Sequence, residues 1–332
     1  MSRKLRVLSA GDVTAVLGMP EVLELVEQAF GERGRGRVQM PPKSYLFFGE
    51  HEGDLRVMPA FLEGLGQAGV KLVSMHPRNP SRHDLPTVMA TILLFSPATG
   101  EPLCIMDGTR ITAMRTAAAA GVATKYLARA DCRVLGLIGA GYQSFYQLEA
   151  MSRVMNVADC AVYDVMAEKA DNLALVAGKR LGLKARTCAT PEEVVRGSDV
   201  LVTATPSTQP IVKDEWVTEG MHINCVGADA PGKQELEAGI LKRARIVIDD
   251  WEQASHSGEI NVPLSRGEIQ RSDVYAEIGD IVAGSQQGRT GDSEITLFDT
   301  TGLAIQDVVC AWKVYEVAQQ KKLGIQMESL NS

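Results

Sequence analysis

The sequence predicts an α/β protein in which an α+β domain is combined with a doubly wound parallel sheet. Three observations predict this class. The chain has 332 residues, which favours two domains over one. Its first third holds short β-type runs joined by hairpin-type connectors, as in antiparallel sheets. From residue 133 onward, short apolar runs alternate with helical patterns, which is typical of a parallel sheet covered on both faces.

The first third contains one helical segment followed by strands. A helical pattern covers residues 12–33 and is interrupted at Met19-Pro20, where proline suits a first helical turn. We interpret residues 40–106 as a mostly antiparallel sheet, with strands at 44–48, 55–58, 70–74, 88–95 and 102–106. An alanine-rich helix is predicted over residues 109–129.

The remainder of the chain alternates strands with helices. Strands are predicted at 134–138, 160–163, 200–203, 222–226, 246–249 and 295–298. Helices are predicted to start near Gln143, Ala167, Pro191, Gln234 and Asp273. A last helix, over residues 303–321, is able to pack back on the first domain, which would make that domain discontinuous.

Composition excludes several classes of partner and location. The net charge of −7 argues against a nucleic-acid or anionic-membrane partner, because such partners need a clustered basic face. No apolar run approaches the roughly 18 residues of a membrane span. The six cysteines are scattered, without C-x-x-C or zinc spacing, so we expect a reduced, cytoplasmic protein without a metal site.

A glycine turn after the strand at 134–138 predicts a Rossmann-type dinucleotide site. Gly139 permits the tight turn, and Gly141 lets the backbone approach a pyrophosphate at the start of the next helix. Asp164 ends the following strand, 23 residues after Gly141, where a carboxylate meets ribose hydroxyls. No arginine follows Asp164 closely, which favours NAD over NADP. The alternative is a glycine turn that binds nothing.

Three charged residues lie where catalytic or binding groups are expected. Lys71 interrupts an apolar strand and is either an edge lysine in water or an acid/base with a lowered pKa. Arg115 lies on a small, apolar helix and is either a surface residue or a clamp for a carboxylate or pyrophosphate. Asp229 follows the strand at 222–226 and is either a helix cap or an acid at the carboxyl edge of the sheet.

Several longer motifs resemble one known family. They are Arg56-Val-Met-Pro-Ala, Gly69-Val-Lys-Leu-Val, Leu85-Pro-Thr-Val-Met, Met114-Arg-Thr-Ala-Ala, Gly227-Ala-Asp-Ala-Pro-Gly-Lys-Gln-Glu-Leu and Asp299-Thr-Thr-Gly-Leu-Ala-Ile-Gln-Asp. Together they are similar, nearly from end to end, to the ornithine cyclodeaminase/mu-crystallin family. Four further stretches resemble its archaeal-type alanine dehydrogenases: Gln39-Met-Pro-Pro-Lys, Gly53-Asp-Leu-Arg, His76-Pro-Arg-Asn-Pro and Gly258-Glu-Ile-Asn-Val.

The resemblance implies a domain organisation and an assembly. A substrate-binding and dimerisation domain would comprise residues 1–116 with 305–332, and an NAD-binding Rossmann domain would comprise residues 117–304. The family places its active site in the cleft between two such domains, and its members form homodimers. We therefore expect a homodimer that binds NAD and a small amino-acid or 2-oxo-acid substrate.

The resemblance also implies the roles of individual residues. Lys71 and Asp229 would be the catalytic acid/base groups, and Arg56, Lys71 and Arg115 would bind the substrate. The residues expected to contact the cofactor are Arg115, Thr116, Gly139, Gly141, Tyr142, Gln143, Asp164, Thr203, Ala204, Thr205, Val226 and Gly302.

The activity that the resemblance implies is NAD-dependent oxidative deamination of a small L-amino acid through an iminium intermediate. L-Alanine, giving pyruvate and ammonia reversibly, is favoured because Arg56 replaces an acid that ornithine cyclodeaminases tend to carry near this point. The alternatives are ornithine cyclodeamination to L-proline and ammonia, and reduction of cyclic ketimines such as pyrroline-2-carboxylate. A binding protein without catalysis, like the thyroid-hormone-binding mu-crystallins, is a further alternative that would not need Lys71 or Asp229.

Overall fold

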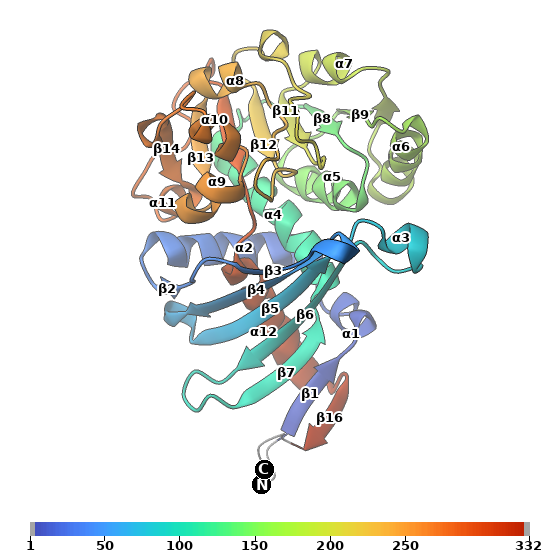
Figure 1. The fold of residues 1–332 in the computed structure, drawn as a ribbon, viewed down its shortest axis with the longest axis vertical. Coiled ribbons are helices and arrows are strands. Elements are labelled where there is room, and N and C mark those ends of the chain that lie inside the picture. Colours follow the sequence, from blue (N-terminus) through green and yellow to red (C-terminus); the bar gives the residue numbers. More distant parts are fainter. Residues whose placement is uncertain (1–3, 329–332) are drawn as a thin grey trace. The chain divides into compact units, whose positions relative to one another are not determined.

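The computed structural model describes residues 4–328, and the chain forms two compact units of mixed α/β structure (Figure 1). Unit 1 comprises Met1–Arg115 and Leu303–Ser332, and unit 2 comprises Thr116–Gly302. Among residues 4–328, no helix is both long enough and apolar enough to span a bilayer.

Unit 1 is built on a sheet that has eight strands within the described residues, in the order β16-β1-β7-β6-β5-β4-β2, with β3 paired to β4. All pairs are antiparallel except β1 with β7. The strands are β1 Lys4–Leu8, β2 Val38–Gln39, β3 Ser44–Phe48, β4 Gly53–Leu62, β5 Gln67–Met75, β6 Val88–Phe95, β7 Pro102–Asp107 and β16 Ile325–Glu328. The helices of this unit are α1 Ala10–Thr14, α2 Met19–Gly34, η1 Gly49–His51, η2 Glu63–Leu65, α3 Asn79–Arg82 and α12 Ala304–Lys321, and α4 Thr109–Leu127 begins in this unit and continues into unit 2 from Thr116 onward.

One face of this sheet is covered by the last helix, α12, which contacts β4, β5 and β6 and also packs on α2 (Figure 1). Burial alternates along β4 and β5, so that every second side chain faces the covered side. Met58, Lys71 and Ile92 are opposite one another in register and form one row on that buried face. The fold therefore places a lysine inside an apolar layer.

Unit 2 contains a parallel sheet that has eight strands among the described residues, in the order β10-β9-β8-β11-β12-β15-β13-β14. Its strands are β8 Val134–Ile138, β9 Asp159–Tyr163, β10 Ala185–Thr187, β11 Val200–Thr203, β12 His222–Cys225, β13 Arg245–Ile248, β14 Val274–Glu277 and β15 Thr296–Asp299. Its helices are α5 Tyr142–Val154, α6 Ala167–Leu181, α7 Pro191–Arg196, η3 Asp214–Trp216, α8 Ala238–Arg243, α9 Trp251–Ser257, α10 Asn261–Ser265, η4 Arg271–Asp273 and α11 Ile278–Val282.

Two apolar clusters show that this sheet is doubly wound, as predicted. One cluster joins the sheet to α4, α5 and α6, and the other joins it to α7, α8 and α9. Neighbouring residues of one strand, such as Leu201 and Val202, belong to different clusters because successive side chains point to opposite faces. The strand order reverses between β8 and β11, and ligands of open α/β sheets bind outside the carboxyl ends of the strands at such a switch point.

Two predicted helices begin four to five residues later than expected. Residues 234–237 are extended, because the backbone N–H groups of Glu235 and Leu236 donate to the buried carboxylate of Glu259 rather than to a helical turn. The helix expected near Asp273 is a short 3-10 turn followed by strand β14, which adds to the edge of the sheet beside β13. The next helices begin later, at Ala238 and Ile278.

Candidate functional site

Lys71 is a fully buried charged group of unit 1. Its side chain is 0% exposed, and its Nζ lies 2.6 Å from Oδ2 of Asp307 on α12. Burial, assisted by the charge of Arg115, lowers the pKa of Lys71 to about 7, although the neighbouring Asp307 opposes the shift. The prediction that Lys71 faces away from Val70 and Leu72 is confirmed, and the alternative of an edge lysine in water is wrong. A lysine with this pKa can both accept and donate a proton near neutral pH.

Arg115 pairs with the carboxylate of Asp307, as Lys71 does. Its Nε donates to Oδ1 of Asp307 at 3.0 Å, and its Nη1 donates to Oε1 of Gln306 at 3.1 Å. The guanidinium is buried rather than exposed on the surface of α4. Asp307 thus joins Lys71 and Arg115, two of the predicted site residues, in one buried group. Sequence reasoning assigned no role to Gln306 or Asp307, although a polar pair within the otherwise apolar first half of α12 is a usable signal.

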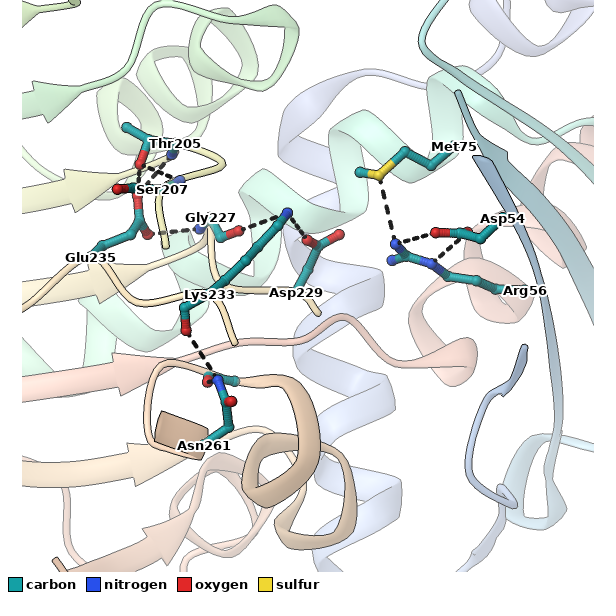
Figure 2. Close-up of polar contacts among 11 residues, drawn as sticks. Asp54, Arg56, Met75, Thr205, Ser207, Gly227, Asp229, Lys233, Glu235 and Asn261 are labelled. Carbon is teal, nitrogen blue, oxygen red and sulfur yellow. Dashed lines mark hydrogen bonds and ion pairs between the residues drawn. The ribbon is translucent and has the colours of Figure 1, made fainter. Parts of the chain in front are cut away.

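Arg56 lies on the same buried face of the sheet, two positions before Met58 on β4. Its Nε and Nη2 donate to the two carboxylate oxygens of Asp54 at 3.0 and 3.1 Å, and Nη2 lies 3.6 Å from the sulfur of Met75 (Figure 2). This bidentate pair fixes the orientation of the guanidinium plane. The role of Arg56 in binding a substrate carboxylate stays a prediction.

The glycine turn of unit 2 has the backbone geometry that its sequence predicted. Gly139 has φ +100°, and a Cβ there would lie 2.6 Å from the carbonyl oxygen of Ala204, so no other residue fits without a shift. Gly141 precedes the first turn of α5 and has open space where a side chain would be. Asp164 accepts hydrogen bonds from the N–H groups of Ala140 and Met166, at 2.7 and 2.8 Å. Its carboxylate is therefore held against the turn.

A pocket of about 330 Å³ opens at the switch point between β8 and β11. Five of the residues predicted to contact the cofactor line it: Gly139, Gly141, Asp164, Ala204 and Thr205. Lys169 of α6 also lines it, and sequence reasoning did not single out this residue. Tyr142 instead lines a second pocket, between α5 and α6, and is 60% exposed. Among the other candidates, Thr203 is fully buried, and neither Gln143, Val226 nor Gly302 lines the first pocket.

Two buried carboxylates hold residues that were predicted to contact the cofactor. Glu235 accepts hydrogen bonds from Oγ1 of Thr203, from the N–H and Oγ1 of Thr205, and from the N–H of Gly227, all within 3.0 Å. Figure 2 shows its contacts with Thr205 and Gly227. Asp249 likewise accepts from the N–H groups of Thr301 and Gly302. Sequence reasoning missed both acids, which hold predicted cofactor contacts in place.

Replacing Glu235 with glutamine is expected to lower the free energy of unfolding by about 1–3 kcal/mol, because four donors point at this carboxylate and an amide nitrogen cannot accept from them. Burial raises the pKa of Glu235, yet these donors favour its ionised form. Urea denaturation of Glu235→Gln beside the exposed-site control Glu215→Gln measures the effect. Equal stabilities would mean that Glu235 carries a proton in the native protein.

Asp229 lies in the turn that follows β12. Its Oδ1 is 2.5 Å from Nζ of Lys233, and the same amine is 3.5 Å from the carbonyl oxygen of Gly227 (Figure 2). No helix begins here, so the interpretation of Asp229 as a helix cap is wrong. Within residues 4–328, no group of three or more His, Cys, Asp or Glu side chains has the geometry to hold a metal ion.

Comparison with known proteins covers almost the whole chain. Residues 3–322 match the model of the ornithine cyclodeaminase/mu-crystallin family. Alanine dehydrogenase of Archaeoglobus fulgidus is 51% identical over 318 residues, which span 96% of each chain. A solved archaeal alanine dehydrogenase dimer with bound NAD is 50% identical, with a TM-score of 0.94 over 98% of this chain and 99% of that one.

A second solved structure shows that such similarity extends to other activities. The Thermococcus litoralis Delta(1)-pyrroline-2-carboxylate reductase in complex with NADH and L-proline is 40% identical, with a TM-score of 0.93. The alignment covers 96% of this chain and 99% of the reductase chain. The motifs, the two units and these comparisons agree: the chain belongs to the ornithine cyclodeaminase/mu-crystallin family.

Proposed function

We propose that the protein is an NAD-dependent amino-acid dehydrogenase that oxidatively deaminates a small L-amino acid, with L-alanine as its substrate. The observation that carries the chemistry is the buried group of Lys71, Asp307 and Arg115, in which a lysine with a pKa near 7 adjoins an arginine. The 51% identity to an archaeal alanine dehydrogenase supports the choice of substrate.

The chain uses NAD as its cofactor, and its residues fit a dinucleotide. Gly139 and Gly141 leave room for a pyrophosphate at the start of α5, and Asp164 lines the adjoining pocket with a carboxylate for ribose hydroxyls. NAD, when bound, supplies the acceptor for the hydride that leaves the substrate Cα. Solved relatives with bound NAD or NADH support this assignment.

The side chains of the protein orient the substrate and move its protons. Arg115 and Arg56 pair with the substrate carboxylate and so fix the direction of the Cα–H bond. The ammonium group of the substrate first gives up a proton, loss of hydride from Cα then leaves an iminium, and water adds to the iminium carbon. Lys71 and Asp229 share the proton transfers: one proton leaves the attacking water, one is added to the nitrogen of the carbinolamine, and the carbinolamine hydroxyl loses its proton as the C–N bond breaks and ammonia departs. The remaining product is the 2-oxo acid.

The Asp54–Arg56 pair favours a substrate with a single amine. A diamine substrate such as ornithine needs an acid for its second ammonium group, and Asp54 is an acid at the edge of this face. Its two oxygens are already bidentately paired with Arg56, at 3.0 and 3.1 Å. This arrangement supports alanine over ornithine.

We also propose that the protein is a homodimer. A solved alanine dehydrogenase relative is a dimer. Strand β3 exposes three large apolar side chains, Leu46, Phe47 and Phe48, of which Phe47 is 74% exposed. An apolar strand of this kind is typical of an interface between protein chains.

The test is to incubate the purified protein with NAD and either L-alanine or L-ornithine, and with NADH and pyrroline-2-carboxylate, while NADH and products are recorded. NADH and pyruvate formed from alanine are expected. Proline and ammonia formed from ornithine without net NADH would establish a cyclodeaminase instead. NADH consumed only with pyrroline-2-carboxylate would establish a ketimine reductase, and no turnover with any substrate would favour a binding protein.

A further inference from the structure

Asp229 belongs to a segment whose backbone is determined by its own sequence. Ala230-Pro231-Gly232-Lys233 forms a turn closed by the Lys233 N–H, which donates to the Ala230 carbonyl at 3.3 Å. Proline at the second position and glycine with φ +81° at the third are the residues that a type II turn requires. The turn brings the side chain of Lys233 back toward Asp229 without a helix.

The turn is also fixed from outside. Asn261, the first residue of α10, accepts a hydrogen bond from the Gly232 N–H at 3.0 Å. It also donates its Nδ2 to the Lys233 carbonyl at 3.0 Å (Figure 2). These two bonds hold the backbone on both sides of the Gly232–Lys233 peptide. The Cα of Lys233 is therefore held in place, and its side chain is only 16% exposed.

The Lys233 amine connects Asp229 to the loops around the cofactor pocket. It lies 2.5 Å from Asp229 Oδ1 and 3.5 Å from the carbonyl oxygen of Gly227. The N–H of Gly227 donates to Glu235, which also holds Thr205 of the pocket wall. One amine thus sets the position of the Asp229 carboxylate relative to the walls of that pocket.

We propose that Lys233 is a positioning residue, which orients the carboxylate of Asp229 for proton transfer in the deamination reaction. The inference rests on the proposed function, because it acts through the acid/base role of Asp229. Lys233 itself does not contact the reacting atoms. Its contribution is to restrict Asp229 to one orientation through Oδ1, and small displacements of a catalytic group are costly in rate.

The first test compares Lys233→Met with Lys233→Arg. Methionine keeps the length and apolar stem but loses the amine, so kcat is expected to fall roughly 10- to 100-fold, while the dissociation constant of NAD, measured by fluorescence titration, stays within about threefold. Arginine restores a donor to Asp229 and is expected to recover most of the loss. Lys242→Met, at an exposed position of α8, is the matched control and should leave kcat unchanged.

A double-mutant cycle with Asp229→Asn separates positioning from a general structural effect. If Lys233 acts through Asp229, Lys233→Met costs little further activity in the Asp229→Asn background. An equal loss in both backgrounds, or no recovery with arginine, would overturn the proposal for Lys233 and leave the role of Asp229 intact. If Asp229→Asn alone has wild-type kcat, the assignment of Asp229 fails, and the role of Lys233 fails with it.

Discussion

Replacing Lys71 with methionine is expected to lower kcat for L-alanine oxidation by roughly 10²- to 10⁴-fold, the range of a lost general acid/base. NAD binding should be unchanged, because the cofactor pocket is lined by residues of unit 2. The chemical step is affected because the neutral amine of Lys71 is the group with a pKa near 7 that can take a proton from water.

The variant is expected to fold. Burial disfavours the charged form of Lys71, as its lowered pKa records, and methionine fills a similar volume without a charge. Asp307 keeps its ion pair with Arg115 at 3.0 Å, so no buried charge is left without a partner. Removal of this amine therefore tests chemistry rather than stability.

Steady-state kinetics at saturating NAD and alanine measure the loss, and fluorescence titration measures the dissociation constant of NAD. Lys184→Met, an exposed lysine of unit 2, serves as the control and should match the wild type. Turnover of Lys71→Met within a few-fold of the wild type would remove Lys71 from the mechanism.

Much of the fold was predictable because it follows from local patterns. The strands at 88–95, 134–138 and 200–203 agree with the structure at both ends, since each is an apolar run bounded by turn residues. Strand β1 and the edge strand β16 were not predicted. They pair with each other from opposite ends of the chain, and no local pattern encodes such a partner.

The site was predictable only in part, for the same physical reason. Strand alternation placed Lys71 on the buried face, and the glycine spacing located the dinucleotide turn. The carboxylates that hold these groups, Asp307 and Glu235, acquire their roles through contacts between distant segments or through burial. The proximity of Lys233 to Asp229 could have been predicted, since Pro231-Gly232 predicts a turn that returns the chain toward Asp229.

Replacing Asp307 with asparagine is expected to move the pH dependence of alanine oxidation to lower pH. In the wild type, Lys71 must be neutral to accept a proton, so kcat rises with pH and levels off above about 7, the pKa of Lys71. Asp307 is the neighbour whose charge favours the ammonium form, whereas burial, Arg115 and Lys43 disfavour it. Without Asp307 the pKa of Lys71 falls further. The rising limb of the pH profile, which is the range where kcat increases with pH, should therefore shift down by about 1–2 pH units.

The same change has a cost in stability. At pH 8, where Lys71 is largely neutral, Asp307→Asn leaves the buried guanidinium of Arg115 without its carboxylate. Breaking a buried ion pair on one side typically costs about 3–5 kcal/mol of unfolding free energy. Because the pKa of Lys71 is lower in the fold than its ordinary value of 10.5, the unfolded chain binds the extra proton between about pH 7 and 10.5. Titration of Lys71 therefore makes the free energy of unfolding increase with pH across this window.

Both effects are measurable on one variant, because the position of a pH limb does not depend on the fraction of folded enzyme. The kcat of wild type and Asp307→Asn is recorded from pH 5 to pH 9 at a temperature where both are folded, with urea denaturation at pH 8 for stability. A limb that remains at the wild-type pH while stability falls would show that Asp307 only supports the fold. A limb that shifts upward would contradict the sign argued for the Lys71–Asp307 pair and would assign the titration to another group.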